Sequence, residues 1–230
     1  MMRPSKIFQS LFVIVLGIIA LSLLAVKFID GHGTDYAYFF PKLVDSYAYY
    51  KEIGLQLHEY TVSMCAGIFV FANPQSLSLS FTQWLLFFFD PIKSAQITFV
   101  FFSLIGGFGT YLCAKNLKLS EQGAIIAGIV FTFSGFFLTR MMIGHLSFQG
   151  FILTPLSAAF LFYSLQFYTK KKWLFSLSAA FLSGLLLAFA IYSGVAVLLP
   201  LMLFLLLALA TLHALLFKTY KASFIALFGV

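Results

Sequence analysis

Long apolar runs without charge dominate this sequence and restrict how the chain can fold. Six such runs, each near the ~20 residues that a helix needs to cross a bilayer, are separated by polar segments. Only 9% of the 230 residues are charged, whereas a soluble domain carries about a quarter. The sequence therefore predicts an all-α, polytopic transmembrane helix bundle with about six spans, forming one membrane domain over residues 1–230.

The expected spans lie at 7–29, 95–114, 122–139, 146–168, 173–191 and 195–217, so that spans two to six occupy 95–221. A long extracytoplasmic loop at 30–94 follows the first span. Within it, Asn73-Pro74-Gln75 separates two apolar stretches, 62–72 and 79–89, which are too short to span and which we interpret as short interfacial or re-entrant helices. We interpret 222–230 as the start of a truncated seventh span, and the chain as the N-terminal part of a longer protein or a truncated product.

The basic residues indicate which side of the membrane each loop faces. With six spans, nine of the 14 Lys and Arg residues lie on the side of the N-terminus and five on the other. With the N-terminus kept on the same side, a further span hidden between Glu59 and Asp90 would change these numbers to four and ten. Because cytoplasmic loops collect Lys and Arg, the six-span arrangement with a cytoplasmic N-terminus is favoured. The basic residues form no stripe interleaved with aromatics, which argues against nucleic acid and leaves membrane lipid as the expected partner.

The first outer loop carries motifs in an order that resembles a known family. These are Asp35-Tyr36-Ala37-Tyr38-Phe39-Phe40-Pro41, then glycines at 54 and 67, then Phe71-Ala72-Asn73-Pro74-Gln75, and finally Gly144-His145-Leu146 after the third span. The order resembles bacterial YfhO-like membrane proteins, which are related to the GT-C class of glycosyltransferases. The resemblance covers roughly residues 30–155. The chain departs from it at 56–60, where the family commonly has Pro and Trp.

The resemblance implies a multi-pass enzyme of the bacterial inner membrane. GT-C enzymes take a sugar from a polyprenyl-phosphate carrier at the outer face of the membrane and pass it to an acceptor hydroxyl. An acid in the first outer loop commonly acts as base or metal ligand, so Asp35 is the candidate catalytic residue and the candidate ligand for a divalent metal. Arg140, His145, His32 and Glu59 are candidate carrier- or substrate-binding residues, and the planar fork of an arginine suits a lipid phosphate.

Two other functions remain open. A non-catalytic membrane scaffold, or truncated relative, fits the short chain. A transporter is disfavoured, because transporters place ionisable residues within their spans, whereas here these residues gather in the outer loop. The candidates also have plainer interpretations: Asp35 as a solvated loop acid, and Arg140 as a side chain snorkelling at a helix end. Gly106, Gly107 and Gly109 are expected to allow close helix packing rather than to bind phosphate.

Overall fold

The computed structural model describes residues 4–64 and 66–217, and for 4–14 and 217 it describes the backbone alone. The predicted start of a seventh span at 222–230 lies outside the described residues. The same holds for Arg3, Lys218 and Lys221, which enter the charge argument, and for Cys65.

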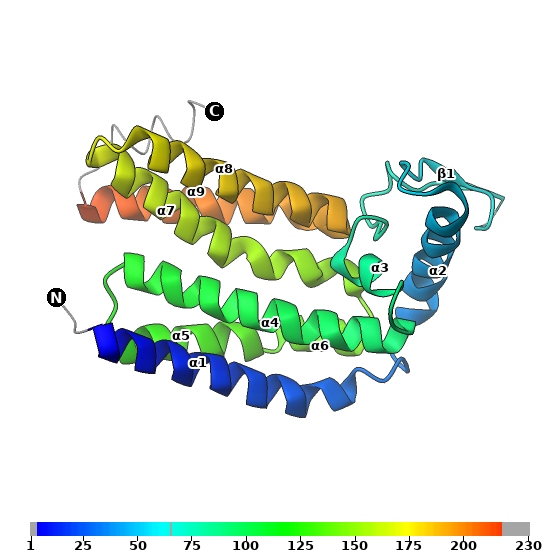
Figure 1. Cartoon of the computed structure of the whole chain (residues 1–230), viewed down its shortest axis with the longest axis horizontal. Coiled ribbons are helices and arrows are strands. Elements are labelled where there is room, and N and C mark those ends of the chain that lie inside the picture. The colour runs from blue at the N-terminus through cyan, green and yellow to red at the C-terminus, as the bar shows by residue number, and fades with distance from the viewer. Residues whose placement is uncertain (1–3, 65, 218–230) are drawn as a thin grey trace.

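The described part of the chain is almost entirely helical, as expected (Figure 1). The bundle contains α1 (Pro4–Ala25), α4 (Pro91–Asn116), α5 (Glu121–Phe133), α6 (Phe136–Met142), α7 (Thr154–Thr169), α8 (Trp173–Ala190) and α9 (Leu199–Phe217). A cap over residues 30–90 contains α2 (Tyr36–Ile53), β1 (Tyr60–Thr61), β2 (Ile68–Phe69) and α3 (Phe81–Leu85). The short turns η1 (Val26–Phe28), η2 (Leu146–Leu153), η3 (Ile191–Val195) and η4 (Ala196–Leu198) complete the chain.

Four helical segments are long and apolar enough to cross a membrane. They are Pro91–Asn116, Glu121–Met142, Leu146–Thr169 and Trp173–Leu216, found among the described residues by length and composition. A shorter apolar stretch, Val15–Phe28, covers the part of α1 whose side chains are described, together with η1. The prediction of an all-helical chain with helices long and apolar enough to cross a membrane is therefore confirmed, whereas the predicted number of six spans is not.

Two glycines with positive φ redirect the chain inside these segments. Gly135 has φ 91° and separates α5 from α6, and Gly194 has φ 94° within η3. The left-handed region is accessible to glycine at little cost. After Gly194 the chain reverses, so that α9 runs back along the bundle in the opposite direction to α8 (Figure 1).

Helix α4 lies between α1 and α7 (Figure 1) and meets both at close range. An added Cβ on Gly109 would lie 2.6 Å from the backbone nitrogen of Leu156, and one on Gly107 would collide with Ile18. The predicted packing role of these glycines is confirmed. Helices α7 and α8 are joined by paired serine hydroxyls, with Ser157 Oγ 2.8 Å from Ser183 Oγ. Small side chains therefore set the spacing of the bundle.

The two ends of the bundle differ in charge. The α4–α5 loop and the α7–α8 loop lie at the end where the chain begins, which we call the lysine end (Figure 1). The basic residues there whose side chains are described are Lys115, Lys118, Lys170, Lys171 and Lys172. The opposite end, which we call the cap end, carries the cap, the α6–α7 connection and the α8–α9 turn (Figure 1). Six of the seven acids lie there, and Glu121 alone lies at the lysine end.

The cap differs from the prediction in two ways. The expected interfacial helix at 62–72 is wrong, since this stretch belongs to an antiparallel hairpin in which Tyr60 pairs with Phe69. Ala66 and Gly67 have φ values of 69° and 115°, which no helix accepts, and the β-branched Ile68 favours a strand. The other stretch, 79–89, does contain a short helix, α3. The 18-residue α2 was not anticipated from the sequence.

Candidate functional site

The predicted catalytic acid, Asp35, lies where the cap meets the bundle, directly before α2. Its backbone nitrogen donates to the carbonyl oxygen of Ile143, at 2.9 Å. The neighbouring Tyr36 hydroxyl donates to the carbonyl oxygen of Met141, at 2.6 Å, and burial raises the pKa of this tyrosine, so it stays protonated. A Cβ on Gly33 would collide with the backbone of Ile143. The loop before α2 is therefore fixed against the end of α6.

This contact brings Asp35 to His145, another predicted site residue. The Nδ1 atom of His145 lies 3.2 Å from Oδ2 of Asp35, at ion-pair distance but without hydrogen-bond alignment. The imidazole ring packs against Phe148 at 4.1 Å between centroids and against Phe39 at 5.4 Å. Arg140 completes the group, because its carbonyl oxygen accepts a 2.8 Å hydrogen bond from the backbone nitrogen of His145. Its guanidinium carbon lies 4.8 Å from the centroid of the Phe148 ring.

The electrostatics favour an uncharged His145. Burial lowers the pKa of His145 below its usual 6.5, Asp35 opposes this shift and Arg140 adds to it. The ring is therefore neutral at pH 7, and its buried Nε2 has no hydrogen-bond partner within the described part of the chain. The Asp35 side chain is 35% exposed, so its carboxylate is reachable from outside the protein. The arrangement thus offers an accessible carboxylate, a neutral imidazole and a fixed positive charge.

The other two predicted site residues stand apart from this group. His32 is exposed, and its backbone nitrogen donates to Oδ1 of Asp30 at 3.0 Å. Glu59 is exposed on the cap and lines an open depression of about 490 Å³ with Tyr49 and Tyr60. The structure therefore brings Asp35, His145 and Arg140 together, and it joins neither His32 nor Glu59 to them by a side-chain contact.

The donor set around Asp35 does not fit a resident metal ion. Among residues 4–64 and 66–217, no group of three or more His, Cys, Asp or Glu side chains is placed to hold one. Asp35 has His145 as its one neighbouring candidate ligand, and Arg140 adds a positive charge close by. A site of this kind would give a cation two protein ligands, fewer than catalytic zinc sites supply.

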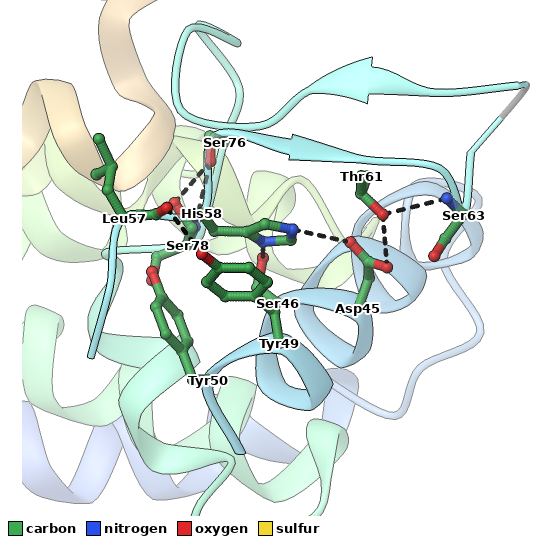
Figure 2. A network of polar contacts seen from close by, with 10 residues as sticks. All are labelled: Asp45, Ser46, Tyr49, Tyr50, Leu57, His58, Thr61, Ser63, Ser76 and Ser78. Atoms are coloured by element: carbon green, nitrogen blue, oxygen red, sulfur yellow. Dashed lines mark hydrogen bonds and ion pairs between the residues drawn. The ribbon is translucent and has the colours of Figure 1, made fainter. Parts of the chain in front are cut away.

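A second polar network in the cap was missed from the sequence (Figure 2). Ser46 Oγ lies 3.1 Å from Nδ1 of His58, and Nε2 of His58 lies 3.8 Å from Oδ2 of Asp45. Thr61 donates its hydroxyl to the other carboxylate oxygen of Asp45, at 2.9 Å. Tyr49 stacks on the imidazole at 4.1 Å. The only signal in the sequence was an acid and a serine side by side, twelve residues before a histidine.

This network has the residue types of a nucleophilic triad but not its geometry. Ser46 and His58 are 2% and 3% exposed, and the 3.8 Å from His58 to Asp45 is too long for a hydrogen bond. The adjoining cavity measures about 10 Å³, room for about one water molecule. Burial lowers the pKa of His58, and Asp45 partly offsets this. We therefore interpret the network as the contact that holds the hairpin on α2.

The fold and the Asp35 group together define a class: an all-helical chain with several helices suited to a membrane and a polar site at one end of the bundle. Comparison with known proteins adds no relative, since no family model, no curated protein and no solved structure matches the chain.

Proposed function

We propose that the chain is a membrane-embedded GT-C-like glycosyltransferase, or its N-terminal part, that transfers a sugar from a polyprenyl-phosphate carrier. The observation that carries the proposal is the 3.2 Å contact between His145 and the exposed carboxylate of Asp35, with Arg140 beside them. Asp35 and His145, which are 110 positions apart in the chain, meet here through close backbone packing. A solvated loop acid with no function would not need a backbone held in place against the end of α6.

The proposal includes a six-span topology in the bacterial inner membrane. The spans are α1, α4, α5 with α6, η2 with α7, α8, and α9, and the N-terminus is cytoplasmic. Support comes from the charge difference between the two ends, because the lysine end matches the cytoplasmic side by the positive-inside rule. The Asp35 group then lies at the outer surface, where lipid-linked sugars are used by enzymes of this class.

The chemistry assigned to the site is a single displacement. The Asp35 carboxylate accepts the proton of the acceptor hydroxyl as its oxygen forms a bond to the anomeric carbon. The bond from that carbon to the carrier phosphate breaks, and the phosphate leaves with the electron pair. Arg140 pairs with the negative charge of this phosphate. His145 acts as a positioning residue beside Oδ2 of Asp35, while Oδ1 faces the hydroxyl of Thr34 at 3.5 Å.

The test uses membranes containing the full chain and a polyprenyl-phosphate-linked hexose as donor, with release of polyprenyl phosphate as the readout. Asp35→Asn keeps the shape of the side chain but removes the base. Loss of general-base catalysis should lower turnover about 10²- to 10⁴-fold. The matched control is Asp30→Asn, which makes the same change five residues earlier and should leave turnover unchanged. Normal turnover in Asp35→Asn would remove the central residue of the proposal.

Arg140 is tested through binding rather than turnover. A charge-assisted contact contributes about 1.5–3 kcal/mol, less where solvent screens it, and Arg140 is partly exposed. Arg140→Gln should therefore weaken binding of a polyprenyl phosphate about tenfold. Lys27→Gln removes an exposed charge from the same side of the membrane and should have no effect. Equal binding by Arg140→Gln and the unmodified chain contradicts the assignment.

A second candidate function, a non-catalytic membrane scaffold, is favoured by the surface of the hairpin. Leu55, Val62 and Phe69 are 81%, 77% and 69% exposed on the cap. Exposed apolar side chains that cluster on an aqueous surface mark contact sites for other proteins. If the scaffold is the function, Phe69→Ser disrupts the biological role while Asp35→Asn does not, and the reverse pattern supports the enzyme.

A further inference from the structure

An apolar groove runs along the bundle between α4, α5, α7 and α9. It encloses about 340 Å³ and is lined by side chains that include Cys113, Leu117, Ala127, Phe131, Pro155 and Leu209. The hydroxyls of Thr110 and Thr154, which also line it, are turned to the carbonyl oxygens of Gly106 and Phe151. The surface of the groove is therefore apolar. The helices that line it belong to segments long and apolar enough to cross a membrane.

The groove opens toward the lysine end. Leu117 and Leu119, in the loop after α4, both line it, and the exposed Lys118 lies between them. The α7–α8 loop lies close to this opening, because Nε2 of Gln166 donates to Oδ1 of Asn116 at 2.7 Å. This hydrogen bond joins the last turn of α7, four residues before Lys170, to the end of α4.

The charge around this opening is strongly positive. Five lysines face one acid, Glu121, and that acid is paired with Lys115 at 3.1 Å. Lys170, Lys171 and Lys172 are exposed, and no ion pair joins them to any described residue. An apolar groove that ends beneath a cluster of lysines is complementary to a molecule with a hydrocarbon chain and an anionic head.

We propose that this groove binds an anionic glycerophospholipid from the leaflet at the lysine end. One acyl chain lies in the groove between α4, α5, α7 and α9. The phosphate lies among Lys118 and the lysines at 170–172. A second copy of the chain is a poorer occupant. Its own lysine end has one acid, Glu121, which is already paired with Lys115, so it would bring little negative charge to this opening. The inference depends on the bundle being in a membrane and not on the transferase function.

The head-group contact is tested with the purified full chain in phosphatidylcholine nanodiscs. Replacing part of this lipid by phosphatidylglycerol should raise the thermal unfolding midpoint and leave bound lipid visible by native mass spectrometry. The triple variant Lys170→Gln, Lys171→Gln and Lys172→Gln should weaken phosphatidylglycerol binding about tenfold to a hundredfold. A matched triple variant at Lys27, Lys51 and Lys93, all exposed at the cap end, should bind it normally.

The chain contact is tested by filling the groove. Ala127→Phe places a ring inside it and should displace the bound lipid, with Ala127→Leu as a milder version if the first does not fold. Ile126→Phe is the control, because Ile126 is 60% exposed and does not line the groove. The expected result is loss of retained phosphatidylglycerol in the Ala127 variants and retention in the Ile126 variant.

Three outcomes would overturn the proposal. The first is equal stabilisation by phosphatidylcholine and phosphatidylglycerol, which would leave no role for the lysines. The second is equal lipid retention in Ala127→Phe and Ile126→Phe. The third is a two-chain species without lipid that Ala127→Phe dissociates, which would make the groove a self-association surface. Inorganic phosphate alone should not shift the unfolding midpoint, and a shift equal to that of the lipid would also reject the proposal.

Discussion

Replacing Gly109 by alanine tests how closely α4 packs against α7. With a suitable control, this packing can be separated from the helix propensity of alanine. The added Cβ would lie 2.6 Å from the backbone nitrogen of Leu156, 2.7 Å from its Cβ and 2.8 Å from its Cα. Real carbon atoms do not approach this closely, and most of the obstacle is backbone. Helix α7 must therefore move away from α4, and overpacking of this kind costs about 1–3 kcal/mol.

The same substitution at Gly184 provides the control. Gly184 lies within α8 and has nothing within 4 Å of an added Cβ. Alanine there should stabilise the protein by about 0.5–1 kcal/mol through helix propensity alone. Because Gly109→Ala gains the same propensity term, the difference between the two variants isolates the clash.

Thermal unfolding of both variants in one detergent measures this difference. The 1–3 kcal/mol cost corresponds to midpoints about 2–12 °C apart, with Gly109→Ala the lower. Midpoints within about 1 °C of each other, half of the smallest shift that 1 kcal/mol produces in a chain of this size, would refute the close packing of α4 against α7.

The cap and the α7–α8 contact lead to three further expectations. Burial lowers the pKa of His58 below 6.5 in the folded protein. As the pH falls below about 6.5, the unfolded chain therefore binds a proton first, and the free energy of unfolding decreases. Unfolding curves between pH 7 and 5 should show a smaller decrease in His58→Gln. Gly144→Ala, at φ 91° and with its Cβ against the cap backbone, should cost over 1 kcal/mol and speed amide exchange in the loop before α2. Ser183→Ala should cost about 1–2 kcal/mol in thermal unfolding, since it leaves the buried Ser157 with fewer partners.

The bundle was predictable because a membrane imposes both the length and the composition of its helices. The prediction placed one span at 95–114, whereas α4 runs from Pro91 to Asn116. The extra turn begins at Asp90, whose side chain accepts from the backbone nitrogen of Lys93 at 2.9 Å, with a proline at the first helical position. These are ordinary helix-start signals.

The cap was predicted poorly because its local signals compete. Helix α2 buries residues at helical spacing, including Tyr36, Phe39, Leu43 and Tyr50. The dense aromatic content of this stretch, and Pro41 within it, favoured an interfacial anchor over a helix. The hairpin depends on a turn with positive φ at Ala66, which a non-glycine residue rarely adopts and which no sequence pattern here announces.

The Asp35 group was predictable in its parts but not in its contacts. The predicted six-span topology puts Asp35 and His145 on the same side of the membrane. Their 3.2 Å approach depends on Gly33 and Gly144, each of which lets one loop lie directly on the backbone of the other. Such packing between loops more than a hundred residues apart leaves no periodic pattern. The contact of His58 with Asp45 joins residues only 13 positions apart, but it depends on how the hairpin folds onto α2, which no periodic pattern indicates either.

In the proposed topology, the lysine end and the cap end lie on opposite sides of a membrane. A labelling experiment tests this directly in intact bacteria, in a chain with Cys65→Ser and Cys113→Ser to remove native thiols. Gln75→Cys lies in the cap, and Lys171→Cys is exposed at the lysine end. A membrane-impermeant maleimide should label position 75 from outside and reach position 171 only after the membrane is opened. Labelling of position 171 in intact cells, with protection of position 75, would contradict the topology and remove the Asp35 group from the outer face.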